Sequence, residues 1–127
     1  MTNKIEIGVG MPHGLYLDEF GSQVWAAFGH PAYLVGSAMK GKQWRDIDVR
    51  LILPDKEYED MKLGDPKYPH QNGKWVALVM AFSALGHKIT GLPIDFQIQQ
   101  QTYANEKYDG PRNALGFIEL RIEPKHN

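Results

Sequence analysis

The chain has 127 residues, of which 43% are hydrophobic and 23% charged, so it fits one globular domain with a modest core spanning 1–127, without a separate substrate domain. Lysine and arginine total 14 against 15 acidic residues, a formal net charge of -1, which excludes a positive field over the whole molecule that would attract nucleic acid or an acidic membrane. The absence of cysteine excludes a disulfide framework and thiol catalysis. With no signal peptide and no apolar stretch near about 18 residues, we expect a cytoplasmic protein that makes no membrane contact.

The N-terminal third predicts a strand, a helix and a second strand. Residues 4–10 alternate apolar residues with polar or small ones, the pattern of a half-buried strand. Apolar residues at steps of three and four predict a helix over 15–28, with Asp18 and Glu19 near its N-terminus, where negative charge is favourable. Residues 32–35 are β-branched or aromatic in part and predict a short buried strand.

The next strand carries charge on one face. Residues 45–53 alternate, so that four apolar residues lie on one face while the other face carries Asp46, Asp48, Arg50 and Ile52. The following segment, 55–72, is polar and broken by proline and glycine, and it predicts a short charged helix followed by a surface loop.

The C-terminal half predicts a helix and two strands. An apolar stripe predicts a helix from Lys74 that ends near Gly86. Residues 92–99 predict a strand with an aspartate on its polar face, residues 100–113 a loop, and residues 114–123 a strand at a sheet edge. The predicted fold is α/β (α+β), with an α-β-β-α-β core, terminal strands, and a mixed sheet with its helices on one face.

Three features of this pattern predict a phosphate-binding and metal-binding site. Gly36 and Ser37 close one strand, where the backbone can approach phosphate oxygens and a hydroxyl can bind them. Asp46 and Asp48 stand at i and i+2 on the next strand, and Asp95 stands on a later one. Carboxylates that converge repel one another unless a divalent cation lies between them, and oxygen ligands of this kind favour Mg²⁺ or Mn²⁺.

The same motifs resemble those of the nucleotidyltransferases of the DNA polymerase beta-like superfamily. The resemblance covers roughly residues 15–99, and the motifs that carry it are Leu34-Val35-Gly36-Ser37, Asp46-Ile47-Asp48 and Ile94-Asp95-Phe96. It implies transfer of a nucleotidyl group from a nucleoside triphosphate such as ATP to an acceptor hydroxyl, with Mg²⁺ or Mn²⁺ as cofactor.

The resemblance also implies a role for each motif residue. Asp46 and Asp48 would bind both metal ions, and Asp95 would hold the metal nearest the acceptor and help to activate its oxygen. Gly36 and Ser37 would position the outgoing phosphates. Three cations of the intervening loop could neutralise the triphosphate or could be solvated loop charges: Lys40, Lys42 and Arg45.

Two departures from the family pattern leave alternatives open. Arg50 lies on the same face as the aspartates, where a hydrophobic residue is more usual, and it could pair with an aspartate or meet a phosphate. No acceptor-binding domain is expected, so the acceptor, which could be a protein, an RNA or a small molecule, would be bound by a partner, a second copy, or the loops at 55–72 and 100–113. The alternatives are a catalytically idle nucleotidyltransferase-fold module that binds a nucleotide or a partner, and a structural domain without a site.

Overall fold

The computed structural model describes residues 12–36 and 46–117. The helices are α1 (His13–Phe28), α2 (Asp55–Asp60), the 3-10 turn η3 (Pro69–Gln71), α3 (Gly73–Thr90) and α4 (Gln101–Lys107). The strands are β1 (Ala32–Val35), β2 (Ile47–Leu53), β3 (Ile94–Gln100) and β4 (Asn113–Ala114). The mixed architecture of helices and strands predicted from the sequence is confirmed.

The strands form one mixed sheet in the order β3-β2-β1-β4. β1 runs antiparallel to β2 and to β4, while β2 and β3 run parallel. The parallel register pairs Asp48 with Asp95 and Arg50 with Gln97. Since register partners on neighbouring strands point to the same face, the charged residues of β2 and β3 are brought together on one side of the sheet.

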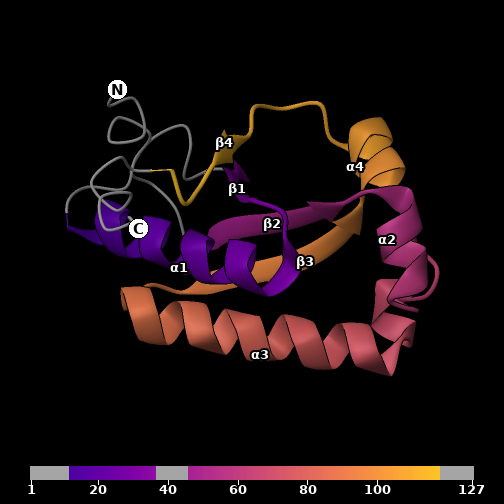
Figure 1. Cartoon of the computed structure of the whole chain (residues 1–127), viewed down its shortest axis with the longest axis horizontal. Coiled ribbons are helices and arrows are strands. Elements are labelled where there is room, and N and C mark those ends of the chain that lie inside the picture. The colour runs from indigo at the N-terminus through magenta and orange to yellow at the C-terminus, as the bar shows by residue number, and fades with distance from the viewer. Residues whose placement is uncertain (1–11, 37–45, 118–127) are drawn as a thin grey trace, which may run out of the picture.

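The two long helices cover one face of the sheet, as Figure 1 shows for α1 and α3. Burial alternates along β2 and β3, so their buried apolar residues face these helices, while Ile52 lies on the opposite face. Phe96 lies at the centre of this layer, with its ring 6.0 Å from that of Phe20 on α1 and 5.4 Å from that of Phe82 on α3. The other face of the sheet carries the polar side chains, and α2 and α4 lie at one end of the strands (Figure 1).

The helix α3 is longer than the sequence pattern predicts. Its predicted end near Gly86 is wrong, because the helix continues to Thr90 and is capped by Gly91 at φ 75°. Gly86 instead lies inside the helix, where an added Cβ would stand 3.0 Å from the Ile94 side chain and 3.1 Å from Phe20. Its missing side chain therefore allows α3 to pack closely on the sheet and on α1.

Asp18 has a different role from the one expected at a helix N-terminus. The helix α1 begins at His13, so Asp18 lies beyond its first turn and is only 1% exposed. Its Oδ1 accepts hydrogen bonds from the backbone N–H groups of Gly116, at 2.5 Å, and Phe117, at 3.1 Å. A buried carboxylate thus fastens the segment after β4 onto α1.

The segment 100–113, predicted as a loop, contains the helix α4 directly after β3. Thr102 donates from its backbone N–H and from its hydroxyl group to the carboxylate of Asp55, the first residue of α2. This contact supplies the partner that a helix N-terminus requires, from a residue distant in the chain. Local pattern does not reveal such a partner, which is why the sequence favours a loop.

Two predicted strands lie partly or wholly outside the described residues. The strand predicted over 4–10 falls outside them, and of the strand predicted over 114–123 only the first four residues are described. Within the described part, β4 is short and lies at a sheet edge, as predicted. None of the described helices combines the length and the apolar character needed to cross a membrane.

Candidate functional site

The open face of the sheet brings Asp48 and Asp95 together with Arg50. The two aspartates are register partners on β2 and β3, strands that lie about 4.8 Å apart in a sheet. One nitrogen of Arg50, Nη2, lies 3.8 Å from Asp48 Oδ1 and 3.4 Å from Asp95 Oδ2. The structure therefore gathers one positive and two negative side chains at the start of the parallel strands.

Arg50 is held in this position by the backbone. Its Nη1 donates to the carbonyl oxygens of Asp95, at 2.7 Å, and Val49, at 3.1 Å, and its side chain is 14% exposed. Of the two roles that the sequence leaves open for Arg50, the structure shows pairing with the aspartates. The carboxylate contacts are longer than the backbone hydrogen bonds, so Arg50 is fixed mainly by carbonyl oxygens.

Asp48 lies in surroundings that oppose its negative charge. Burial is the main cause that raises the pKa of Asp48, and the charges of Asp95 and Asp46 raise it further. Arg50 lowers it, but the balance remains a raised pKa. Arg50 therefore does not compensate fully for the burial of Asp48 and the negative charges near it, and an additional cation beside Asp48 would be favourable.

Gly36 brings the end of β1 against Asp48. Its backbone has φ +77°, which favours glycine, and an added Cβ would collide with Asp48 Oδ2. The antiparallel register that pairs Val35 with Asp48 produces this contact. Gly36 thus lies directly beside Asp48, with no room for a side chain between them.

The other predicted site residues either lie farther from Asp48 and Asp95 or fall outside the described residues. Asp46, just before β2, is exposed, and its charge acts on Asp48. The remaining members of the predicted phosphate-binding loop fall outside the described residues: Ser37, Lys40, Lys42 and Arg45.

The donor set suits a hard divalent cation, although three carboxylates do not converge. Among residues 12–36 and 46–117, no group of three or more histidine, aspartate or glutamate side chains is close enough to hold a metal ion. Asp48 and Asp95 supply carboxylate oxygens beside each other, the ligand type that Mg²⁺ and Mn²⁺ prefer. These two residues therefore fit as the protein part of such a site.

A cavity of about 400 Å³ begins at Gly36 and Asp48 and continues along the open face. Three residues of β2 and one of β3 form its floor: Asp48, Arg50, Ile52 and Gln99. The 107–112 segment lines it from the other side, and we call this segment the roof. Ile52 lies four residues after Asp48 on β2, a distance of about 13 Å along the strand, and Gln99 is its register partner on β3. The cavity has the size of a small-molecule site.

The roof is fixed by Arg112. Its guanidinium donates to Asn105 Oδ1 at 3.0 Å and to the carbonyl oxygens of Ala104, at 3.3 Å, and Tyr108, at 3.2 Å. The sequence indicates 100–113 only as a loop that could bind an acceptor, and it does not identify Arg112 as the residue that fixes it. The Asp-Gly-Pro sequence at 109–111 is a turn signal that could have located the bend.

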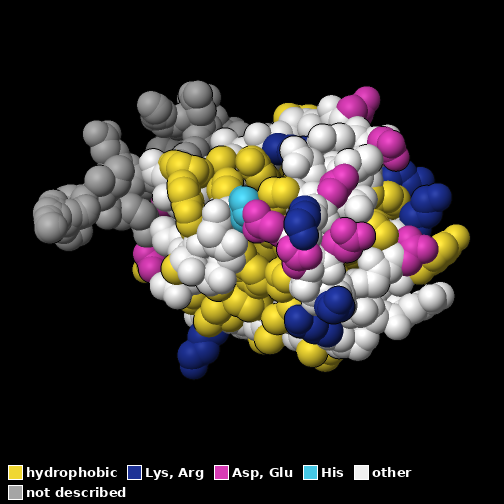
Figure 2. Space-filling view, turned by 45° about the vertical axis from the view of Figure 1, so that its right-hand side comes forward, with side chains coloured by type: hydrophobic (Ala, Val, Ile, Leu, Met, Phe, Trp, Pro, Cys, Tyr) yellow, Lys and Arg dark blue, Asp and Glu magenta, His cyan; other side chains and the backbone are white. Residues whose placement is uncertain are grey.

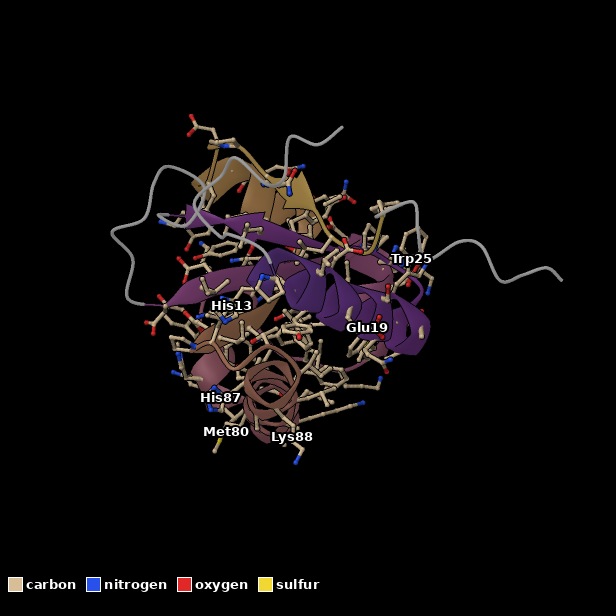
Figure 3. All side chains as sticks on the ribbon, turned by 90° about the vertical axis from the view of Figure 1, so that its left-hand side faces the viewer. His13, Glu19, Trp25, Met80, His87 and Lys88 are labelled. Atoms are coloured by element: carbon tan, nitrogen blue, oxygen red, sulfur yellow. The ribbon has the colours of Figure 1, made fainter. Side chains whose placement is uncertain are left out.

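The described histidines do not form a second centre. Figure 3 shows His13 on α1 and His87 on α3, on the helical side of the molecule. His87 Nδ1 lies 2.9 Å from the carbonyl oxygen of Leu92, and His30 Nε2 lies 2.8 Å from Glu57. These contacts support loops and helix ends, in agreement with their spacing in the sequence.

The face of the molecule that Figure 2 shows carries charges of both signs. Figure 2, which turns the end with α2 and α4 toward the viewer, shows acidic and basic side chains interspersed. Comparisons of this chain with protein-family models, with curated proteins and with solved structures find no match.

Proposed function

We propose that the chain is a metal-dependent nucleotidyltransferase that moves a nucleotidyl group from a nucleoside triphosphate to an acceptor hydroxyl. The observation that carries this proposal is the pairing of Asp48 with Asp95 beside Gly36, at the mouth of a cavity of nucleotide size. Acidic oxygens next to a close-approach glycine suit a triphosphate and its cation, whereas a purely structural sheet face gains nothing from crowding carboxylates.

Under this proposal the acceptor hydroxyl would give its proton to the Asp95 carboxylate as its oxygen attacks the α-phosphorus in line, and the bond to the bridging oxygen would break, so that pyrophosphate leaves. Asp48 and Asp95 would hold the cation, and Asp95 would also orient the acceptor hydroxyl. Asp46, just before β2, would have to move toward them to add a third carboxylate, as the resemblance implies. The cofactor, Mg²⁺ or Mn²⁺, supplies positive charge against the charge that develops on the phosphate oxygens. Gly36, whose missing side chain leaves room for the Asp48 carboxylate, would position the outgoing phosphates together with Ser37 and the loop cations.

Arg50 has a consistent place in this proposal. Its backbone hydrogen bonds fix the guanidinium beside the two carboxylates, while burial still raises the pKa of Asp48. The bound cation would add the missing charge while Arg50 keeps its contacts with the carbonyl oxygens. We also propose that the acceptor is a protein, an RNA or a small molecule, and that a protein partner or a second copy of the chain helps to bind this acceptor. We propose a cytoplasmic location for the protein.

A second function is favoured by the same arginine. Arg50 contacts both carboxylates, so it could replace the metal ion permanently. The chain would then be an idle module of the same fold that binds a nucleotide or a partner without transfer.

Labelled nucleoside triphosphates distinguish the two functions. The protein is incubated with each α-labelled triphosphate, Mg²⁺ or Mn²⁺, and RNA, protein and small-molecule acceptors, and labelled products are separated. The transferase predicts a labelled product that disappears in Asp48→Asn and Asp95→Asn. Binding without any product would support the idle module, and no binding, unaltered by these substitutions, would exclude both.

A further inference from the structure

We propose that the cavity under the roof binds the base and ribose of the nucleoside triphosphate, so that this chain provides its own nucleoside site. This inference rests on the proposed function, because that function places the α-phosphate at Asp48 and Asp95. The cavity begins at Gly36 and Asp48 and extends to Ile52 and Gln99. Its length of about 13 Å along β2 accommodates a ribose and a base.

The charges of the cavity favour an uncharged ligand group in its far part. Two of its cations already have partners, since Arg50 contacts Asp95 and Arg112 contacts Asn105 and backbone carbonyl oxygens. The remaining charges of the roof are opposite in sign, Lys107 and Asp109, and neither has a side-chain partner among the described residues. A second phosphate group would therefore find little uncompensated positive charge there.

The surfaces of the cavity suit a planar, hydrogen-bonding group. Ile52 on the floor and Pro111 in the roof are apolar, and Tyr108 in the roof is 52% exposed. Gln99 lines the cavity from β3 with an amide that can both donate and accept hydrogen bonds, as base edges require. An aromatic ring and an amide beside apolar walls are a typical way to bind a base.

The roof is held in place by contacts within the protein, without a ligand. Arg112 fixes the carbonyl group of Tyr108, and the Tyr103 ring stands 6.5 Å from the Tyr108 ring in an edge-on arrangement. The start of α4 is fastened to α2 by the hydrogen bonds between Thr102 and Asp55. Because these contacts hold the roof in place, ligand binding requires little further ordering of it.

The experiment compares two probes by calorimetry on the full chain: magnesium tripolyphosphate, which has no nucleoside, and the magnesium complexes of ATP, GTP, CTP and UTP. Tyr108→Ala is expected to weaken the tightest nucleotide about fivefold or more without changing tripolyphosphate binding. Gln99→Ala is expected to reduce the discrimination among the four nucleotides. Tyr68 is an exposed tyrosine that does not line the cavity, so Tyr68→Ala is the matched control and should leave the affinity for both probes unchanged.

The outcomes separate this inference from the proposed function. If tripolyphosphate binds with Mg²⁺ while Tyr108→Ala and Gln99→Ala bind every nucleotide as wild type does, the nucleoside site is wrong and the phosphate site stands. If neither probe binds the wild-type protein, the proposed function fails, and the inference fails with it. A thermal unfolding curve for each variant excludes loss of folding as the cause of weaker binding.

Discussion

Arg50 on β2 donates a 2.7 Å hydrogen bond to the backbone carbonyl oxygen of Asp95 on β3. The same guanidinium lies within 4 Å of the carboxylates of Asp48 and Asp95. A single side chain thus links the two strands that carry the paired aspartates and supplies their nearby positive charge. Removing this side chain should therefore lower folding stability and increase the stabilisation that a bound divalent cation provides.

Replacing Arg50 by methionine should destabilise the metal-free protein by about 1–3 kcal/mol, since two carbonyl oxygens lose their donor and two carboxylates lose the positive charge beside them. Mg²⁺ should then raise the melting temperature of Arg50→Met more than that of wild type, because the cation takes over neutralisation. Lys56→Met is the control, since the exposed Lys56–Asp60 pair should change stability by no more than about 0.5 kcal/mol. Equal Mg²⁺ responses in Arg50→Met and wild type would contradict a shared cation site.

Gly36 and Gly29 form a matched pair, because both have φ 77° but only Gly36 faces a side chain. Alanine at either position should cost about 1–2 kcal/mol for the left-handed backbone. Gly36→Ala should in addition weaken binding of the magnesium–nucleotide complex at least tenfold, because its Cβ displaces the Asp48 carboxylate. Calorimetric titration of both variants measures this difference, and equal affinities would separate Gly36 from the site.

Asp18 should be important for stability but not for binding. Asp18→Ala leaves two partly buried N–H groups without their acceptor and should lower the free energy of unfolding by about 1–3 kcal/mol in urea denaturation. Asp18→Asn should cost less, since both N–H groups bond to the same oxygen, which an amide retains. If both substitutions were equally costly, the negative charge itself would be the essential feature.

The contact between Asp55 and Thr102 predicts a specific dependence on pH. Hydrogen bonds from Thr102 lower the pKa of Asp55 below its usual value near 3.8. A carboxyl group whose pKa is lower in the folded state adds stability above its unfolded pKa, and this stability is lost as pH falls through the folded pKa. Melting temperatures of wild type and Asp55→Asn should therefore differ at neutral pH and converge below about pH 4. A constant difference down to pH 2 would contradict this assignment.

Short-period patterns predicted most of the described fold, and contacts between distant residues account for the errors. The alternation in β2 and β3 correctly placed Asp48, Arg50 and Asp95 on the polar face, because burial on one side imposes that period. The parallel register that makes Asp48 face Asp95 is a tertiary property. The role of Asp18, the course of α3 past Gly86, and the helix α4 likewise depend on partners far along the chain.

The central claim is that Asp48 and Asp95 hold a divalent cation together with a nucleoside triphosphate. Mn²⁺ broadens the NMR signals of nuclei close to it, so a titration of the ¹⁵N-labelled full chain with Mn²⁺ and a triphosphate locates the ion. We predict selective broadening of the amide signals of Gly36, Asp48 and Asp95, and its loss in Asp48→Asn. Broadening centred elsewhere, or an unchanged pattern in Asp48→Asn, would contradict the claim.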